Sequence, residues 1–116
     1  MSVAIFYEAE SRTVLAELSG DIDHCSAADL RKPIDRELMQ RLPLRLILDF
    51  SKVGFMDSSG IGLIIGRYKL MNDLGGSIVI TDPAPGVKKI MELGGVGRLC
   101  SIIDSSRSSR FGGVKI

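Results

Sequence analysis

Two short β-prone runs open the chain, with a polar segment between them. The runs span residues 3–7 and 13–18, and residues 8–11 separate them. In the second run, apolar side chains occupy every other position, which is the period of a strand with one buried face. The pattern predicts a β-hairpin. The residues predicted to share one face of its second strand are Val14, Ala16 and Leu18.

Beyond the hairpin, patterns typical of helices alternate with short apolar runs typical of buried strands. The predicted helices cover residues 27–41, 59–74 and 87–93. The predicted strands cover residues 44–50, 77–81 and 100–103. A hairpin followed by alternating helices and strands implies an α/β fold with a mixed, mostly parallel sheet and helices packed over it. We expect a single domain over residues 1–116, with residues 105–116 as a weakly structured tail.

Two residues bear on where the first predicted helix begins. Ser26 is the predicted N-cap, because serine is a favoured cap and apolar residues follow at helical spacing. Pro33 conflicts with this helix, since an interior proline removes a hydrogen bond and clashes with the preceding turn. Two explanations stay open: the helix kinks at Pro33, or it begins later than Ser26.

The second predicted helix combines an apolar stripe with several glycines. Glycine costs about 1 kcal/mol relative to alanine inside a helix, so Gly60, Gly62 and Gly66 need a reason. One is close packing on the protein's own sheet; the other is a smooth helix face that a partner approaches. We expect this face, with Leu63 and Arg67, to lie outside the stripe. The stripe consists of Ile61, Ile64, Ile65, Tyr68 and Met71.

Composition excludes several kinds of partner. The formal net charge is +1 and no basic stripe is visible, so we expect no nucleic acid. The apolar runs are too short to span a bilayer and no signal peptide is apparent, which predicts a cytoplasmic protein without a membrane partner. Cys25 and Cys100 are expected to be reduced thiols, and the scattered Cys and His residues predict neither a metal site nor a cofactor.

Enzyme motifs are mostly missing. His24 is the only histidine, so a catalytic triad would have to combine it with Ser58 or Ser59 and a carboxylate. The glycine-flanked serine of hydrolases and the phosphate-binding loop of nucleotide hydrolases are both absent. We therefore expect no catalytic residues, and a small serine hydrolase remains an alternative.

The stretch Asp57-Ser58-Ser59-Gly60 lies between a predicted buried strand and a predicted helix. Unpaired backbone N–H groups and the positive end of the helix dipole favour oxygen ligands and anions at such a place. One interpretation is an N-cap, for which Ser and Asp are standard residues. The other is a phosphorylation site, which would switch up to two negative charges. Spacing alone does not choose between them.

Several motifs together resemble the anti-sigma factor antagonists, bacterial proteins of the STAS domain type, and most closely their sporulation branch. The resemblance covers roughly residues 3–104 and implies a STAS-like fold. It rests on Gly20-Asp21-Ile22-Asp23-His24, Phe55-Met56-Asp57-Ser58-Ser59-Gly60-Ile61-Gly62, Gly66-Arg67-Tyr68-Lys69 and Gly75-Gly76.

The resemblance implies a non-enzymatic partner switch that regulates transcription through a sigma factor. The residue that matches the family's phosphorylated serine is Ser58. Its kinase would be the anti-sigma factor, a serine kinase with a histidine-kinase-like ATP fold, and a PP2C-type serine phosphatase would reverse the reaction. The unphosphorylated chain, expected to be a monomer when free, would bind the kinase and release the sigma factor. A STAS-type sensor of a nucleotide or small metabolite is a further alternative.

Residues beside Ser58 match the family's partner-binding positions. Asp23 matches a loop carboxylate that meets a basic residue of the kinase. We expect Ile22 to anchor this loop and to leave the Asp23 side chain free for that contact. Two alternatives stay open for Asp23: a solvated loop carboxylate, or a cap for the following helix. Ser58 is expected at or before the N-cap, and Ser59 in the first turn. The remaining matched neighbours of the phosphorylation site are Asp57, Ser59, Gly60 and Gly62.

Overall fold

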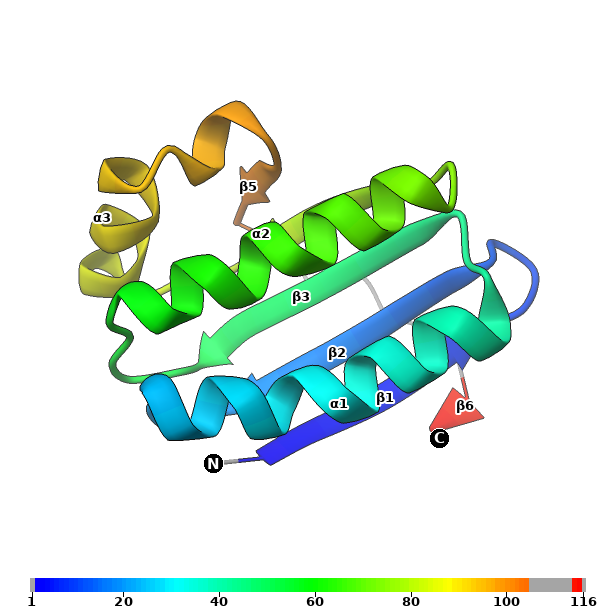
Figure 1. The fold of residues 1–116 in the computed structure, drawn as a ribbon, viewed down its shortest axis with the longest axis horizontal. Helices are drawn as coiled ribbons and strands as arrows, with labels where there is room; N and C mark the ends of the chain where they lie inside the picture. The colour runs from blue at the N-terminus through cyan, green and yellow to red at the C-terminus, as the bar shows by residue number, and fades with distance from the viewer. Residues whose placement is uncertain (1, 105–113, 116) are drawn as a thin grey trace.

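A six-stranded sheet forms the centre of the computed structural model, which describes residues 2–104 and 114–115 (Figure 1). Its order is β5-β4-β3-β2-β1-β6. β1 pairs antiparallel with β2 and β6, and β2, β3, β4 and β5 are parallel. This confirms the predicted mixed, mostly parallel sheet with its hairpin. The strands are β1 (Ser2–Glu8), β2 (Thr13–Ser19), β3 (Arg45–Lys52), β4 (Ser77–Thr81), β5 (Ser101–Ile103) and β6 (Val114–Lys115).

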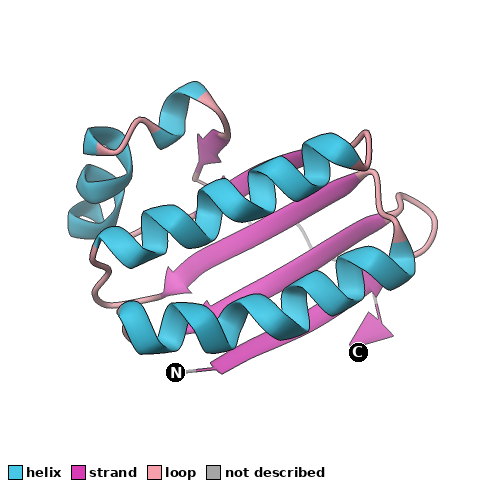
Figure 2. Cartoon of the chain, viewed as in Figure 1, coloured by secondary structure: helices cyan, strands magenta, loops and turns pink. Residues whose placement is uncertain are grey.

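The two long helices lie side by side over one face of the sheet, as Figure 2 shows. They are α1 (His24–Arg41) and α2 (Ser58–Asp73). A shorter helix, α3 (Pro85–Leu93), and the 3-10 turn η1 (Val96–Arg98) lie beyond α2, toward β5. Of the predicted weakly structured tail, the two residues of β6 are described and the others lie outside the described residues.

The core lies between the sheet and the two long helices. Val14, Ala16 and Leu18 are fully buried, as the alternation predicted for the second strand. Burial of apolar side chains at about 25 cal/mol per Å² is the main stabilising term for such a layer. The central strand and α1 supply most of the other large buried side chains, namely Leu46, Leu48, Phe50, Leu30, Ile34 and Leu38.

The start of α1 differs from the prediction. Asp23, not Ser26, is the N-cap: its Oδ1 accepts a hydrogen bond from the Ser26 backbone N–H at 2.9 Å, and the Asp23 N–H donates to the Ser26 hydroxyl at 2.8 Å. This reciprocal pair satisfies two N–H groups that the helix leaves free. The helix therefore begins before Ser26, so a later start is wrong, and it runs through Pro33 between the buried residues Leu30 and Ile34.

The buried face of α2 also differs from the predicted stripe. Leu63 and Arg67 are buried, whereas Ile61, Ile65 and Tyr68 are only half-buried. The reason is that α2 packs against α1 as well as the sheet, which turns its covered side toward α1. A charged residue is tolerated there because it has a partner on the other helix.

That partner is Asp35 on α1. The Arg67 Nε lies 2.7 Å from Asp35 Oδ1, and Arg67 Nη2 donates to Asp35 Oδ2 at 3.3 Å. A third guanidinium nitrogen, Nη1, donates to the Leu63 carbonyl at 3.2 Å. Burial lowers the pKa of Arg67, and the Asp35 carboxylate opposes that shift. This ion pair joins the two helices that border the candidate site.

Candidate functional site

Two loops at one end of the sheet are joined by backbone hydrogen bonds. The Ile22 N–H, after β2, donates to the Phe55 carbonyl at 2.9 Å, and the Asp57 N–H, after β3, donates to the Ile22 carbonyl at 3.1 Å. Ile22 and Met56 are both buried and form an isolated parallel bridge. The bridge confirms that Ile22 anchors its loop. It also holds Asp23 beside Asp57.

Each of these aspartates caps a long helix. Asp57 Oδ1 accepts a hydrogen bond from the Ser59 N–H at 2.8 Å, as Asp23 does from Ser26. Asp23 is exposed but is not free, so the cap is the alternative that the structure bears out. Hydrogen bonds from the Ser26 backbone and side chain lower the pKa of Asp23 below its usual value. The site thus presents two carboxylates at two adjacent helix N-termini.

Ser58 is the first residue of α2 and its side chain is exposed. The expectation that it caps or precedes the helix is wrong, because Asp57 takes the cap position. Within the part of the chain that the structure describes, the Ser58 hydroxyl forms no hydrogen bond. It is therefore an accessible hydroxyl at the positive end of a helix, beside the Ser59 and Gly60 N–H groups that donate to Asp57. Ser59, the next residue, is half-buried.

The three glycines of α2 have different surroundings. A Cβ atom on Gly60 would collide with the Met56 side chain, so this glycine permits a close contact between loop and helix. A Cβ on Gly62 or Gly66 would have no heavy atom within 4 Å. Close packing on the protein's own sheet is thus wrong for Gly62 and Gly66. They leave an open, smooth face on α2.

That face forms one side of a shallow groove between α1 and α2. Its volume is 300 Å³. Small side chains make up much of its floor, and its charged lining residues are basic. The lining residues are His24, Ala27, Ala28, Arg31, Ser59, Gly62, Leu63, Gly66 and Arg67. The structure therefore brings Ser59 and Gly62 into the groove, while Asp23, Asp57 and Ser58 lie at its end, where the helices begin.

The arrangement does not assemble a catalytic triad. His24 is exposed at the start of α1, and no hydrogen bond joins it to Ser58 or Ser59 among the described residues. A serine nucleophile needs an adjacent base within hydrogen-bonding distance. Over the same described residues, no group of three or more His, Cys, Asp or Glu side chains could hold a metal ion. Nor does any described helix combine the length and apolar character that a membrane span requires.

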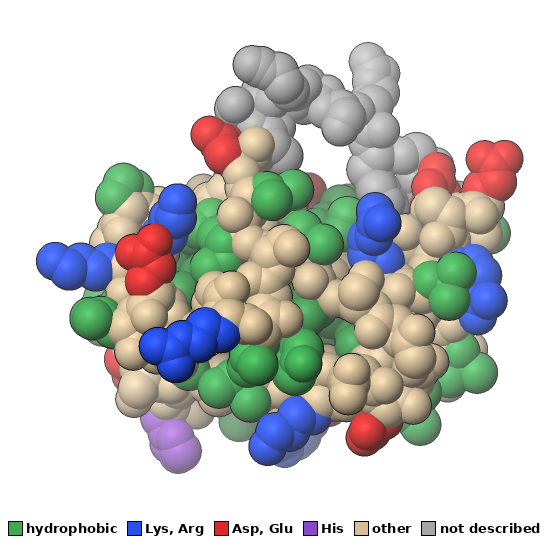
Figure 3. Space-filling model, turned by 90° about the horizontal axis from the view of Figure 1, so that it is seen from above, with side chains coloured by type: hydrophobic (Ala, Val, Ile, Leu, Met, Phe, Trp, Pro, Cys, Tyr) green, Lys and Arg blue, Asp and Glu red, His purple; other side chains and the backbone are tan. Residues whose placement is uncertain are grey.

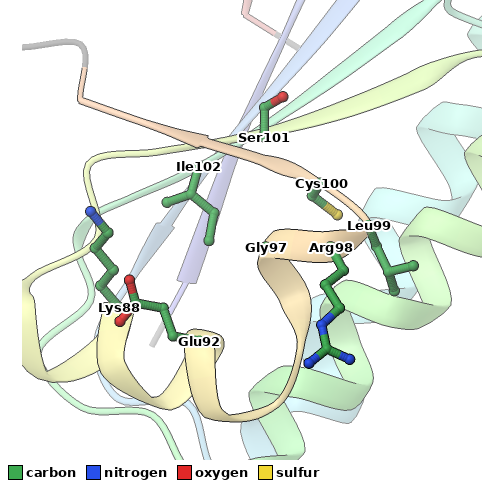
Figure 4. A pocket seen from close by; sticks show the side chains of 8 residues that line it. All are labelled: Lys88, Glu92, Gly97, Arg98, Leu99, Cys100, Ser101 and Ile102. Carbon is green, nitrogen blue, oxygen red and sulfur yellow. The ribbon is translucent and has the colours of Figure 1, made fainter.

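A second hollow lies away from these residues, between α3, η1 and β5 (Figure 4). It has a volume of 430 Å³ and an open mouth lined by Lys88, Glu92 and Arg98. Burial raises the pKa of the Cys100 thiol in its wall to about 11. A thiol with this pKa stays protonated near neutral pH and is a weak nucleophile. The Cys100 thiol therefore gives the hollow no reactive thiolate.

The face shown in Figure 3 carries scattered positive and negative side chains that form no continuous basic stripe. Two features near the site were not predicted from the sequence. The Asp35–Arg67 pair escaped notice because its members lie 32 residues apart on different helices. The exposure of Phe55, which reaches 54%, was not predicted because nothing in the local pattern showed that its side chain faces outward.

The chain is similar to several known proteins. The family described as "STAS domain" matches residues 5–109. The anti-sigma F factor antagonist of Paenibacillus polymyxa is 32% identical over 105 residues, which cover 90% of each chain. The solved structure of the anti-sigma factor antagonist SpoIIAA in its unphosphorylated form has a TM-score of 0.74 and 27% identity, and 90% of both chains is covered. The Bacillus cell fate determinant SpoIIAA in its phosphorylated form has a TM-score of 0.67 and 26% identity, with 90% of this chain and 94% of that one covered.

Proposed function

The chain belongs to the STAS domain family, and we propose that it acts as an anti-sigma factor antagonist switched by phosphorylation of Ser58. The observation that carries this proposal is the exposed Ser58 hydroxyl at the start of α2, beside two capping carboxylates. Relatives in the sequence and structure comparisons are named for this function. One similar structure is of a phosphorylated form, which supports a phosphorylation switch in this fold.

A phosphate on Ser58 suits the local structure. The Ser59 and Gly60 N–H groups already donate to Asp57, so the favourable term is the helix dipole, whose positive end favours a negative charge there. Asp57 and Asp23 oppose the modification by repulsion, but both carboxylates already accept hydrogen bonds from their own helices. The fold should therefore accept the phosphate without rearrangement.

The same charge has a different effect when a partner covers the site. A dianion under a docked protein must lose its water and meets any negative groups of that protein. The proposed partner is an anti-sigma factor serine kinase with a histidine-kinase-like ATP fold, whose bound nucleotide would itself carry phosphates. Asp23 would meet a basic residue of this kinase, and Asp57, Ser59, Gly60 and Gly62 would lie within the contact. Phosphorylation would thus release the kinase.

In the proposed cycle the chain has two direct partners, the kinase and a phosphatase, and catalyses no step itself. The unmodified chain binds the kinase and frees a sigma factor; the kinase transfers a phosphate from ATP to Ser58; and a PP2C-type phosphatase removes it. In this cycle the protein would be cytoplasmic, a monomer when free, and a substrate and not an enzyme.

The test uses the unmodified chain as bait in extracts of its native cells. We expect it to retain a small ATP-binding serine kinase, and mass spectrometry after addition of ATP should place the phosphate on Ser58. Ser58→Ala should block the modification, whereas Ser59→Ala should leave it at most slightly slower. Phosphate on Ser59 of the Ser58→Ala chain at an undiminished rate would contradict the assignment.

A further inference from the structure

Phe55 is an aromatic side chain that the fold leaves uncovered. It lies in the loop between β3 and α2, three residues before Ser58, and 54% of its surface is exposed. The other described aromatic residues are half-buried or, in the case of Phe50, fully buried. In a chain with 5% aromatic residues, this exposed ring is unusual and calls for a reason.

The backbone around Phe55 is fixed. Its carbonyl accepts the hydrogen bond from Ile22, and the residues near it on either side, Val53 and Met56, are buried. With Met56 turned into the core, the Phe55 side chain faces outward, and the exposed Gly54 adds no side chain beside it. Because more than half of Phe55 is exposed, a polar residue at this position would cost the fold little packing. A ring on a fixed backbone loses little conformational freedom on docking, which favours binding.

Three carboxylates lie on the two joined loops that carry the ring. Asp57 follows two residues later, and Asp23 is held beside Asp57 by the bonds to Ile22. Asp21 also faces this loop, since its Oδ1 lies 3.6 Å from the position a Cβ would take on Gly54. The basic residues of the same loops are Lys52, at the end of β3, and His24, at the start of α1. The two loops thus present one exposed aromatic ring together with charged side chains that are mostly acidic.

We propose that Phe55 is a hydrophobic anchor that inserts into an apolar pocket bordered by basic side chains on the kinase. This inference rests on the proposed function and identifies the chemistry of its contact. Aromatic anchors at the centre of an interface carry much of the binding energy, and charged borders mainly set the association rate. A phosphate on Ser58 controls whether the kinase can bind this surface. Phe55 determines how tightly the kinase binds the unmodified form.

The experiment measures association and dissociation rates of the full chain with the purified kinase. Phe55→Ala should weaken binding at least tenfold, chiefly through faster dissociation, and Phe55→Leu should lose less. Asp21→Asn should slow association at low salt and leave dissociation almost unchanged. The matched control is Met39→Ala, because Met39 is 57% exposed near the far end of α1, about 24 Å along the helix from Asp23.

The control should bind like the original chain, and Phe55→Ala and Met39→Ala should lower the melting temperature only slightly and to a similar extent, since both side chains are more than half exposed. An unchanged dissociation rate for Phe55→Ala would overturn the anchor, as would an equal loss for Met39→Ala. Ser58→Asp separates the two proposals. If it abolishes binding while Phe55→Ala binds normally, the anchor alone fails; if the original chain binds no kinase, the proposed function fails.

Discussion

Asp23 has a role in the fold and a proposed role at the surface. As N-cap of α1 it needs only a side-chain oxygen, whereas a contact with a basic kinase residue needs its charge. Asp23→Asn should therefore keep the melting temperature and weaken kinase binding at least tenfold. Asp23→Ala should weaken binding similarly and also lower the melting temperature. Calorimetric titration and thermal unfolding measure the two effects, and normal binding by Asp23→Asn would exclude the charged contact.

At the residue scale, the sequence pattern indicated the candidate site but not the structural role of each of its residues. Asp23 and Ser26 are both good caps, and so are Asp57 and Ser58, so local preference cannot rank them. The cross-loop hydrogen bonds to Ile22 determine which residue caps each helix, because they fix both aspartates in extended conformation just before their helices. Such bonds join residues more than 30 positions apart and leave no trace in a local pattern.

At the scale of the element, α2 allows a direct comparison between two of its glycines. Gly66→Ala meets open space and removes a helix-weakening residue, so it should raise the free energy of unfolding by up to about 1 kcal/mol. Gly60→Ala forces Met56 out of place and should lower it by about 1–3 kcal/mol. Urea unfolding measures both changes. A Gly66→Ala chain less stable than the original would contradict the open face.

Hydrophobic period was enough to predict the hairpin, the alternation of helices and strands, and the mixed sheet. It failed at the buried face of α2, because a period of apolar residues cannot identify a buried arginine. Arg67 is covered only because Asp35 meets it from α1, and that pairing depends on how the two helices pack. Leu63 is buried for the same reason, since α1 covers the side of α2 on which it lies.

At the scale of the whole molecule, phosphorylation should act without refolding. The two loops are joined to each other, and the strands before them are buried in the sheet, so the site has a rigid support. In amide spectra of the phosphorylated chain, we expect shifts confined to the loop around Ile22 and the first turns of α1 and α2. Widespread shifts across β3 and β4 would instead indicate that the switch changes the fold.

The most direct test of the switch is the affinity of the kinase for the unmodified and the Ser58-phosphorylated chain, measured side by side. A penalty of about 3 kcal/mol from desolvation and like-charge repulsion corresponds to a more than hundredfold difference. We therefore predict that phosphorylation weakens binding at least a hundredfold, and that Ser58→Ala taken through the same kinase treatment binds as tightly as the unmodified chain. Equal affinities of the two forms would contradict the switch.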